Sequence, residues 1–179
     1  MGAATPVRLD RPLVLIGPMA SGKSTIGQQF AAEHGLDFAD SDKRIAERHG
    51  PIPGIFTAMG EHAFRELEAR EVAALVADGA PRVVSVGGGA ILDTGTQQLL
   101  ARCVVVFLDV DLETVRPRIE RETGRPLLAG DPAARWEELA TRRRPTYLRL
   151  ADVVLDTRGK SAADVVRELT QLISERQSR

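Results

Sequence analysis

Apolar residues along this chain fall into two kinds of run. Short runs rich in β-branched residues predict strands over 13–16, 36–39, 82–86, 104–108 and 153–155. Between them, apolar residues at helical spacing predict helices over 25–34, 43–49, 61–77, 93–101, 111–119, 135–148 and 162–173. We therefore expect an α/β fold in which strands and helices alternate.

Segments rich in glycine, proline or charge separate these elements. The glycines and prolines of 50–54 predict a break after the second helix, and 1–11 is expected to be a loose leader. The charged stretch 120–135 has too little apolar content to join a core, so we expect a mobile surface lid. Trp136, at its end, is expected to pack rather than to take part in chemistry. All of this fits a single domain that spans 1–179.

Strands that alternate with helices predict a parallel sheet covered on both faces. Ligands of such folds bind at the carboxyl ends of the strands. Polar or glycine-rich segments follow four of the predicted strands, at 17–24, 40–42, 87–89 and 155–159. These segments are far apart in the sequence, but we expect them to converge on one crevice.

The composition narrows the possible functions. The chain has 179 residues, 43% of them hydrophobic, and a formal net charge of −1, which predicts neither nucleic-acid nor membrane binding. Cys103 is the only cysteine, so no internal disulfide can form, and we expect a buried small hydrophobe. No stretch approaches the ~20 apolar residues of a membrane helix, and the N-terminus lacks the pattern of a signal peptide. We expect a soluble, cytoplasmic monomer.

The segment 17–24 reads G-x-x-x-x-G-K-S, between a predicted strand and a predicted helix. Its glycines let backbone amides turn toward an anion, Lys23 supplies a cation for the outer phosphates, and the Ser24 hydroxyl is placed to bind Mg²⁺. The positive end of the following helix faces the same phosphates. We predict a P-loop that binds a nucleotide through Gly17, Pro18, Met19, Ala20, Ser21, Gly22, Lys23, Ser24 and Thr25.

Two carboxylates, Asp40 and Asp42, follow the second predicted strand. In an extended segment they share one face, so that one can support Mg²⁺ while the other orients a substrate hydroxyl. The alternative is that Asp40 or Ser41 only caps the next helix. Beside a P-loop, we favour a role in phosphoryl transfer.

Three glycines, Gly87, Gly88 and Gly89, follow the third predicted strand. They cost conformational entropy, so a reason for them is expected. Close approach of a ligand to bare backbone amides is the explanation we favour, and a plain tight turn is the alternative.

Arginines outside the P-loop are candidates for binding anions. Arg65 lies at helical spacing from Glu61 and Glu68, which could hold it toward a carboxylated ligand, although such pairs ordinarily only support a helix. Arg125 lies in the predicted lid and could close over ATP. For the basic run 142–144 the alternative is a solvated helix face.

Six segments together resemble the shikimate kinases, in the order seen in that family. They are GPMASGKST, FADSD, IFTAMGEHAFRELE, VVSVGGGAIL, GRPLL and RRRPTY, and the resemblance that they carry extends over nearly the whole chain, from about residue 13 to 158. The resemblance implies a three-layer P-loop kinase fold, like that of nucleoside monophosphate kinases, with a five-stranded parallel sheet in the order 2-3-1-4-5. It also implies an ATP-dependent phosphotransferase that uses Mg²⁺ and phosphorylates the 3-hydroxyl of shikimate on the pathway to chorismate.

The resemblance further implies roles for individual residues. The catalytic residues are Lys23, Arg125 and Asp42, with Asp42 orienting the attacking hydroxyl. The metal is supported by Ser24 and, through water, by Asp40, and the adenine lies near Arg118 and Arg158. The substrate is bound by Asp42, Arg65, Gly87, Gly88, Gly89, Arg143, Phe56, Phe64 and Glu68, with Glu61 and Glu68 steadying Arg65.

The chain departs from the family at a few positions. Ala20 stands where the family commonly has glycine, and we expect phosphate binding to survive with altered flexibility of the loop. Pro51 and Pro53 stiffen a segment beside the substrate-binding helices and could change the fine shape of the acceptor pocket.

Three other functions are alternatives. A kinase of the same fold could act on another small acid such as gluconate, but the substrate-side segments argue for shikimate. A non-catalytic nucleotide-binding module would be expected to have lost Lys23, Asp42 or Arg125, and all three are present. An RNA-processing P-loop protein would need a basic surface, which the net charge does not supply.

Overall fold

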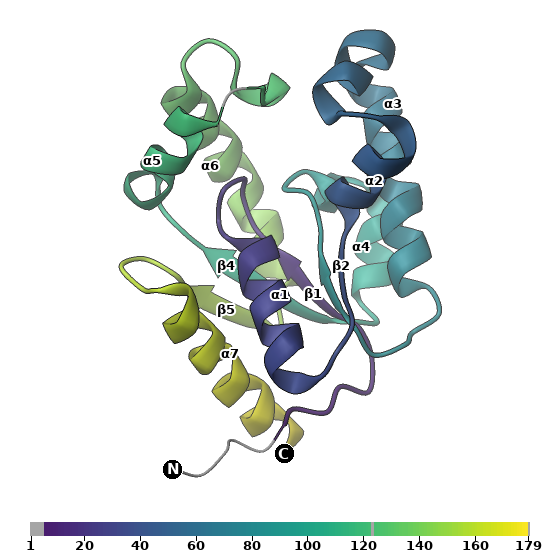
Figure 1. Ribbon diagram of the computed structural model, residues 1–179, viewed down its shortest axis with the longest axis vertical. Helices are drawn as coiled ribbons and strands as arrows, with labels where there is room; N and C mark the ends of the chain where they lie inside the picture. Colours follow the sequence, from purple (N-terminus) through teal and green to yellow (C-terminus); the bar gives the residue numbers. More distant parts are fainter. Residues whose placement is uncertain (1–5, 123, 179) are drawn as a thin grey trace.

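A parallel sheet forms the centre of the computed structural model, which describes residues 6–122 and 124–178 (Figure 1). Its strands are β1 (Leu13–Ile16), β2 (Phe38–Asp40), β3 (Val83–Ser85), β4 (Val104–Asp109) and β5 (Val153–Asp156). They pair in the order β2-β3-β1-β4-β5, and every pairing is parallel. The predicted strands, their order and the fold class are confirmed.

Helices cover both faces of the sheet and make the three layers (Figure 1). They are α1 (Lys23–His34), α2 (Ser41–His49), α3 (Ile52–Val76), α4 (Thr94–Leu100), α5 (Leu112–Arg121), α6 (Pro132–Leu150) and α7 (Ala162–Gln177). Single 3-10 turns add η1 (Ala90–Leu92) and η2 (Pro126–Leu128). Helices α1 and α7 pack on one face, and α3, α4 and α6 pack on the other.

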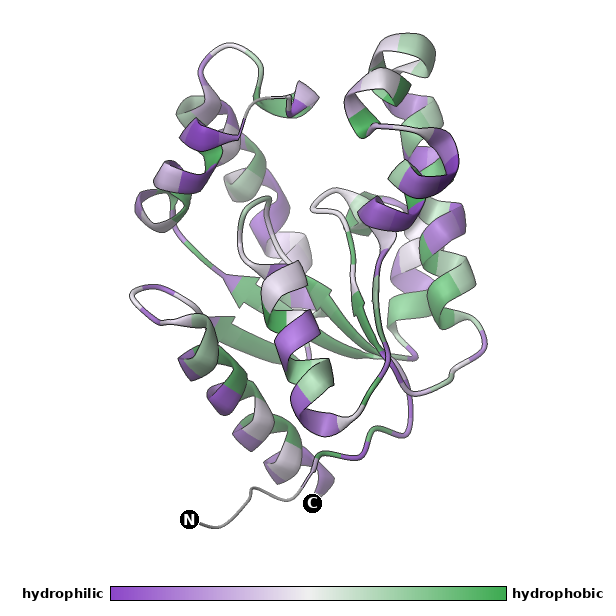
Figure 2. Ribbon diagram, viewed as in Figure 1, coloured by the Kyte–Doolittle hydropathy of each residue, from purple (hydrophilic) through white to green (hydrophobic). Residues whose placement is uncertain are grey.

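The central strand β1 shows why the sheet is buried. All four of its side chains are 0% exposed, because a parallel strand with helices on both faces has no solvent side. Leu13 and Leu15 face α1 and α7, whereas Val14 and Ile16 face the opposite layer. Figure 2 shows the strands as the most hydrophobic part of the ribbon.

The predicted loose leader is partly wrong. Val7 and Leu9 are buried in the layer formed by α1 and α7, and the Val7 amide donates to Nδ1 of His34 at 3.2 Å. The alternation of Val7, Arg8 and Leu9 is that of a half-buried extended segment, and this was the missed signal. Residues 1–5 lie outside the described residues.

The predicted break at 50–54 is shorter than expected. Pro51 precedes α3, and Pro53 lies in its first turn. Proline is tolerated there, because the backbone N–H groups of the first turn have no acceptor within the helix. The helix then kinks at Gly60, whose φ of 82° is not helical. The predicted helix 61–77 is therefore confirmed as the second part of α3, and its first part was missed.

The expectation that 120–135 contributes nothing to the core is wrong for one residue. Leu128 is buried in a cluster with Trp136, Leu139 and the inward side chains of α5, so a hydrophobic contact anchors the segment. Trp136 packs as expected. The mobility of the segment remains a prediction, and Thr123 lies outside the described residues.

Two expectations from composition can also be compared with the structure. Cys103 is buried, as predicted. None of the helices described here combines the length and apolar character needed to cross a membrane.

Candidate active site

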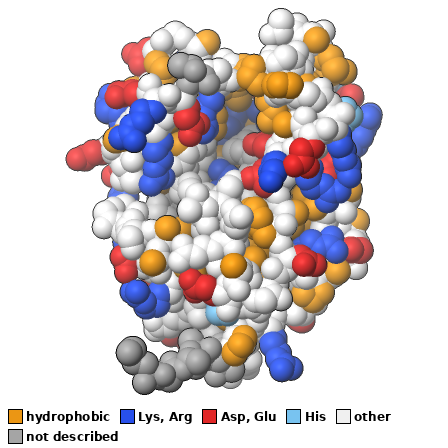
Figure 3. Space-filling model, in the orientation of Figure 1, with side chains coloured by type: hydrophobic (Ala, Val, Ile, Leu, Met, Phe, Trp, Pro, Cys, Tyr) orange, Lys and Arg blue, Asp and Glu red, His pale blue; other side chains and the backbone are white. Residues whose placement is uncertain are grey.

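The loop between β1 and α1 forms the floor of a hollow at the carboxyl ends of the strands (Figure 3). Gly17 and Gly22 have φ values of 147° and 92°, which only glycine adopts readily. A Cβ on Gly17 would lie 2.9 Å from the carbonyl oxygen of Leu108, so the loop packs directly on β4. Lys23 folds back over the loop, and its Nζ donates to the carbonyls of Gly17 and Pro18 at 2.9 and 2.8 Å.

A cavity of about 420 Å³ opens over this loop. It is lined by Met19 through Ile26 and by residues from four other segments: Asp42, Gly88, Arg118, Glu122, Arg125, Thr157, Lys160 and Ala162. The structure thus brings together most of the predicted nucleotide-binding residues. Gly17 and Pro18 lie behind the lining, and Pro18 faces a separate recess.

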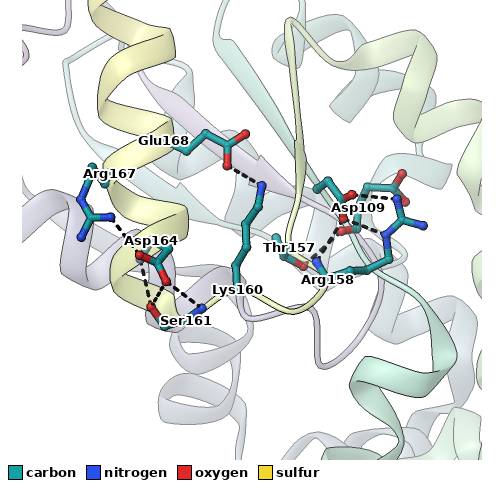
Figure 4. Close-up of polar contacts among 9 residues, drawn as sticks. Asp109, Thr157, Arg158, Lys160, Ser161, Asp164, Arg167 and Glu168 are labelled. Atoms are coloured by element: carbon teal, nitrogen blue, oxygen red, sulfur yellow. Dashed lines mark hydrogen bonds and ion pairs between the residues drawn. The ribbon is translucent and has the colours of Figure 1, made fainter.

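The loop after β5 was only partly predicted. Arg158 (Figure 4) does not line the cavity, and its guanidinium pairs with Asp156 at 2.8 Å. The expected contact of Arg158 with adenine stays a prediction. Thr157 and Lys160 line the cavity instead. The Thr157 hydroxyl donates to the Asp109 carbonyl at 3.1 Å, and Lys160 pairs with Glu168. Thr157 lay within the flagged segment 155–159, but Lys160 gave no signal.

Lys23 is a buried cation without a carboxylate partner among the described residues. Burial lowers its pKa to about 8, although the charges of Asp42 and Asp40 act in the opposite direction. A buried cation whose partners are only uncharged oxygens, here two carbonyls and the Ser21 hydroxyl, is stabilised by an anion that enters the cavity.

A second cavity of about 290 Å³ adjoins the first, and Met19, Asp42, Gly88 and Arg125 line both. It contains the predicted substrate-binding residues Phe56, Phe64, Arg65, Glu68, Gly87, Gly88, Gly89 and Arg143. Ile52 and Leu127 also line it and were missed. The predicted convergence of distant segments on one crevice is confirmed.

Asp42 lies where the two cavities meet. Its Oδ1 is buried and has no hydrogen-bond partner among the residues that the structure describes. Burial raises the pKa of Asp42, and the nearby charge of Asp40 adds to this effect. An unpaired buried oxygen with a raised pKa is suited to accept a proton from a ligand hydroxyl.

Arg65 is held from both sides by carboxylates of its own helix. Nη1 lies 2.6 Å from Glu68 Oε2, and Nη2 lies 3.4 Å from Glu61 Oε1. Burial raises the pKa of Glu68 to about 7, although Arg65 opposes the shift. These contacts fix the guanidinium at the wall of the second cavity, so the ion pairs of Arg65 do more than support the helix.

The three consecutive arginines on α6 have different surroundings. Arg142 is 67% exposed and pairs with Glu138, and Arg144 pairs with Asp109. Arg143 is only 5% exposed, lines the second cavity, and forms no ion pair with any described residue. A buried unpaired guanidinium favours a carboxylate ligand, so the solvated-face alternative fails at this one position.

The triple glycine makes room for side chains of the site. A Cβ on Gly87 would lie 2.4 Å from Glu68 Oε1 and 2.8 Å from Asp42 Oδ1. A Cβ on Gly89 would lie 2.4 Å from the Arg65 guanidinium. We expected a ligand to require the missing Cβ atoms, but at these two positions it is protein side chains that approach. Gly88 lines both cavities and Gly87 and Gly89 line the second, so contact of the three glycines with a ligand stays a prediction.

Asp40 serves two partners at once. Its Oδ1 accepts the Lys43 amide at 3.0 Å and caps α2, and its Oδ2 accepts the Ser24 hydroxyl. Asp40 thus caps α2, but it does more than cap, because its other carboxylate oxygen lies at the P-loop. One hydroxyl and one carboxylate fit Mg²⁺, which takes its remaining ligands from phosphates and water. Within the described ranges, no group of three or more His, Cys, Asp or Glu could hold a metal.

Comparison with known proteins now identifies the family. The family model for shikimate kinase matches residues 19–174, which is most of the chain. The chain belongs to the shikimate kinase family. Its relatives include the shikimate kinase of Stenotrophomonas maltophilia (strain K279a), 44% identical over 160 residues and 88% of each chain. That of Rhodococcus erythropolis (strain PR4 / NBRC 100887) is 42% identical over 167 residues, 91% of this chain and 97% of the relative.

A solved structure agrees with both the family and the fold. The shikimate kinase from Acinetobacter baumannii in complex with shikimate superposes with a TM-score of 0.89 at 33% identity. The match covers 94% of this chain and 96% of that one. The predicted family, the P-loop kinase fold and the class of enzyme, an ATP-dependent kinase, are therefore confirmed.

Proposed function

We propose that this chain transfers the γ-phosphoryl group of ATP to the 3-hydroxyl of shikimate, giving ADP and shikimate 3-phosphate for chorismate synthesis. The observation that carries the proposal is the pair of adjoining cavities. One is built on the P-loop, the other holds a buried unpaired arginine, and Asp42 and Arg125 line both. Two anionic ligands can therefore meet end to end at Asp42.

The donor side binds ATP through the P-loop. Its backbone amides and the N-terminus of α1 surround the phosphates, and Lys23 exchanges its carbonyl partners for phosphate oxygens. Ser24 and Asp40 would hold Mg²⁺, which would neutralise charge on the phosphates. Arg118, Thr157 and Lys160 line the same cavity and are the candidates for binding the base.

The acceptor side binds a carboxylated cyclic alcohol. Arg143 and Arg65 hold the carboxylate, and Phe56 and Phe64, whose ring centroids are 4.8 Å apart, supply an apolar wall for the ring. Gly88 lets the ring approach the backbone without a Cβ in the way. Glu68 keeps Arg65 in position.

In the transfer step, the oxygen of the 3-hydroxyl forms a bond to the γ-phosphorus, and Asp42 Oδ1 accepts the proton of that hydroxyl. The bond between that phosphorus and the bridging oxygen breaks, and ADP leaves. Arg125 exchanges its partner Glu122 for the transferred phosphoryl group as the segment 120–135 closes.

We further propose that the protein is a cytoplasmic monomer without nucleic-acid or membrane partners. Its net charge of −1 gives no general attraction to nucleic acid or to an anionic membrane surface.

The test is ADP release with shikimate and with other small acids, including gluconate. Shikimate should be phosphorylated at the 3-hydroxyl, and gluconate should not react. Asp42→Asn should lower kcat by roughly 100-fold to 10,000-fold while nucleotide still binds, because a general base is lost. Asp37→Asn, an exposed change outside both cavities, is the control. Turnover of gluconate alone, or normal kcat for Asp42→Asn, would contradict the proposal.

A further inference from the structure

Four consecutive carbonyls of the P-loop have hydrogen-bond donors. Lys23 Nζ donates to those of Gly17 and Pro18. Trp136 Nε1 donates to the Met19 carbonyl at 2.9 Å, and Arg118 Nη1 donates to the Ala20 carbonyl at 2.6 Å. A loop whose amides face an anion turns its carbonyls away from that anion, so donors elsewhere must satisfy them.

Ala20 makes the loop conformation costly. Within residues 6–122 and 124–178 it is the one residue other than glycine with a positive φ, at 61°. An L-residue with a Cβ is disfavoured in this left-handed region and persists there only when neighbouring contacts hold it. The peptide between Met19 and Ala20 therefore needs external support.

The donors to the loop carbonyls differ in whether a bound nucleotide can compete for them. Lys23 and Arg118 both line the nucleotide cavity, where a bound nucleotide competes for them. Trp136 is 3% exposed and lines a separate recess of about 180 Å³ behind the loop, with Pro18. It belongs to α6, 117 residues away from Met19 in sequence, so it anchors the loop to the body of the domain.

We propose that Trp136 is a positioning residue of the nucleotide site. Its indole N–H holds the Met19 carbonyl and thereby keeps Ala20 in the left-handed conformation that presents the loop amides to phosphate. The proposal rests on the nucleotide site proposed above. It assigns to the chain's only tryptophan a role that packing alone does not require.

The first test removes the N–H and keeps an aromatic ring. Trp136→Phe should bind ADP–Mg²⁺ roughly five- to tenfold more weakly in calorimetry, the loss expected for one hydrogen bond. KM for ATP should rise by the same factor. Trp136→Tyr, which also lacks a donor at this point, is a second variant in case the first folds poorly. Leu139→Val is the control, because it loosens the same hydrophobic cluster on α6 but leaves the hydrogen bond from Trp136 to the loop in place.

The second test relieves the strain. Glycine adopts a positive φ freely, so Ala20→Gly should bind ADP–Mg²⁺ at least as tightly as the unchanged protein. In the Ala20→Gly background, Trp136→Phe should weaken binding less than twofold. A role in packing alone would not produce this rescue. Unchanged ADP binding in Trp136→Phe, or an equal loss in both backgrounds, would overturn the inference.

ADP binding separates this inference from the proposed reaction, because it needs no acceptor. If the unchanged protein binds ADP but does not phosphorylate shikimate, the proposed reaction fails, and the Trp136 comparison still decides the inference. If it phosphorylates shikimate and Trp136→Phe binds ADP normally, only the inference fails. Absence of ADP binding in the unchanged protein would overturn both.

Discussion

Lys23 titrates in an accessible range. Burial lowers its pKa to about 8, so the ligand-free protein loses this charge as the pH rises through that value. Phosphate binding favours the charged form, and affinity for ADP–Mg²⁺ should therefore fall above pH 8, by roughly tenfold per pH unit at most. Calorimetry across this range tests the prediction. Lys160→Gln, in the same cavity, should keep the fall. A flat profile for the unchanged protein would contradict it.

Arg143 and Arg142 form a matched pair of adjacent residues. Arg143→Met should raise KM for shikimate by roughly tenfold to a hundredfold, because a buried charged donor to the carboxylate is lost. Arg142→Met removes a 67% exposed arginine and should change KM less than twofold. Steady-state kinetics with saturating ATP would decide, and equal effects of the two changes would remove Arg143 from the acceptor site.

Among the individual site residues, those that lie in contiguous sequence motifs could be predicted. Lys23, Asp42 and Arg65 have neighbours whose spacing specifies a phosphate loop or a helix face, and they line the expected cavities. Arg158 pairs with Asp156 two residues away and does not line the nucleotide cavity, so its role near adenine stays a prediction. The bond from Trp136 to Met19 joins distant segments, so no local pattern could reveal it.

Helices α2 and α3 both carry residues that line the second cavity, and a buried carboxylate joins the two helices. Glu71 of α3 is 5% exposed, and it pairs with Arg44 at 2.7 Å and with Arg48 at 2.8 Å, both on α2. Because α2 also carries Asp42, this contact sets the position of Asp42 relative to Arg65.

Loss of the Glu71 charge should destabilise the protein. Glu71→Gln leaves two arginines without their carboxylate and should lower the free energy of unfolding by about 2–4 kcal/mol. Urea denaturation measures this change. Glu66→Gln, on the same helix, removes a 56% exposed carboxylate that pairs with His62 and should cost about 0.5 kcal/mol or less. Similar costs for the two variants would show that Glu71 does not stabilise the fold in this way.

Element boundaries followed the sequence where periodicity was strong. The second part of α3 was predicted from its apolar spacing, but the first part was missed, because proline and glycine suggested a turn. Proline is tolerated in the first turn of a helix, so the same residues permit either structure. Tertiary contacts of Ile55 with Ile45 and Phe64 decide in favour of a helix.

On the scale of the whole molecule, Arg125 is shared by the two cavities. It lines both cavities and contacts Glu122 through Nε at 2.7 Å. If both ligands draw it inward, each should strengthen the binding of the other. Shikimate affinity should therefore rise when ADP–Mg²⁺ is present, and calorimetry measures the difference.

Arg125→Ala should abolish this coupling and lower kcat by roughly 1,000-fold or more, because the developing phosphoryl charge loses its cation. Arg121→Ala, an exposed change nearby on α5, should preserve both. If the coupling survives in Arg125→Ala, another group must carry it.

The convergence of distant segments on one crevice was predictable from the parallel topology of the sheet. The sharing of Asp42 and Arg125 between two cavities was not predictable, because it depends on side-chain placement.

Cys103 has a practical consequence for observing the segment 120–135. It is the only cysteine, it is 4% exposed, and burial raises the pKa of its thiol to about 11. At neutral pH it is therefore a protonated, shielded thiol that reacts slowly with maleimides. A cysteine introduced at exposed Ala129 would take up a fluorescent dye without competition. Site-specific labelling therefore does not require the replacement of Cys103, although native cysteines ordinarily have to be removed first.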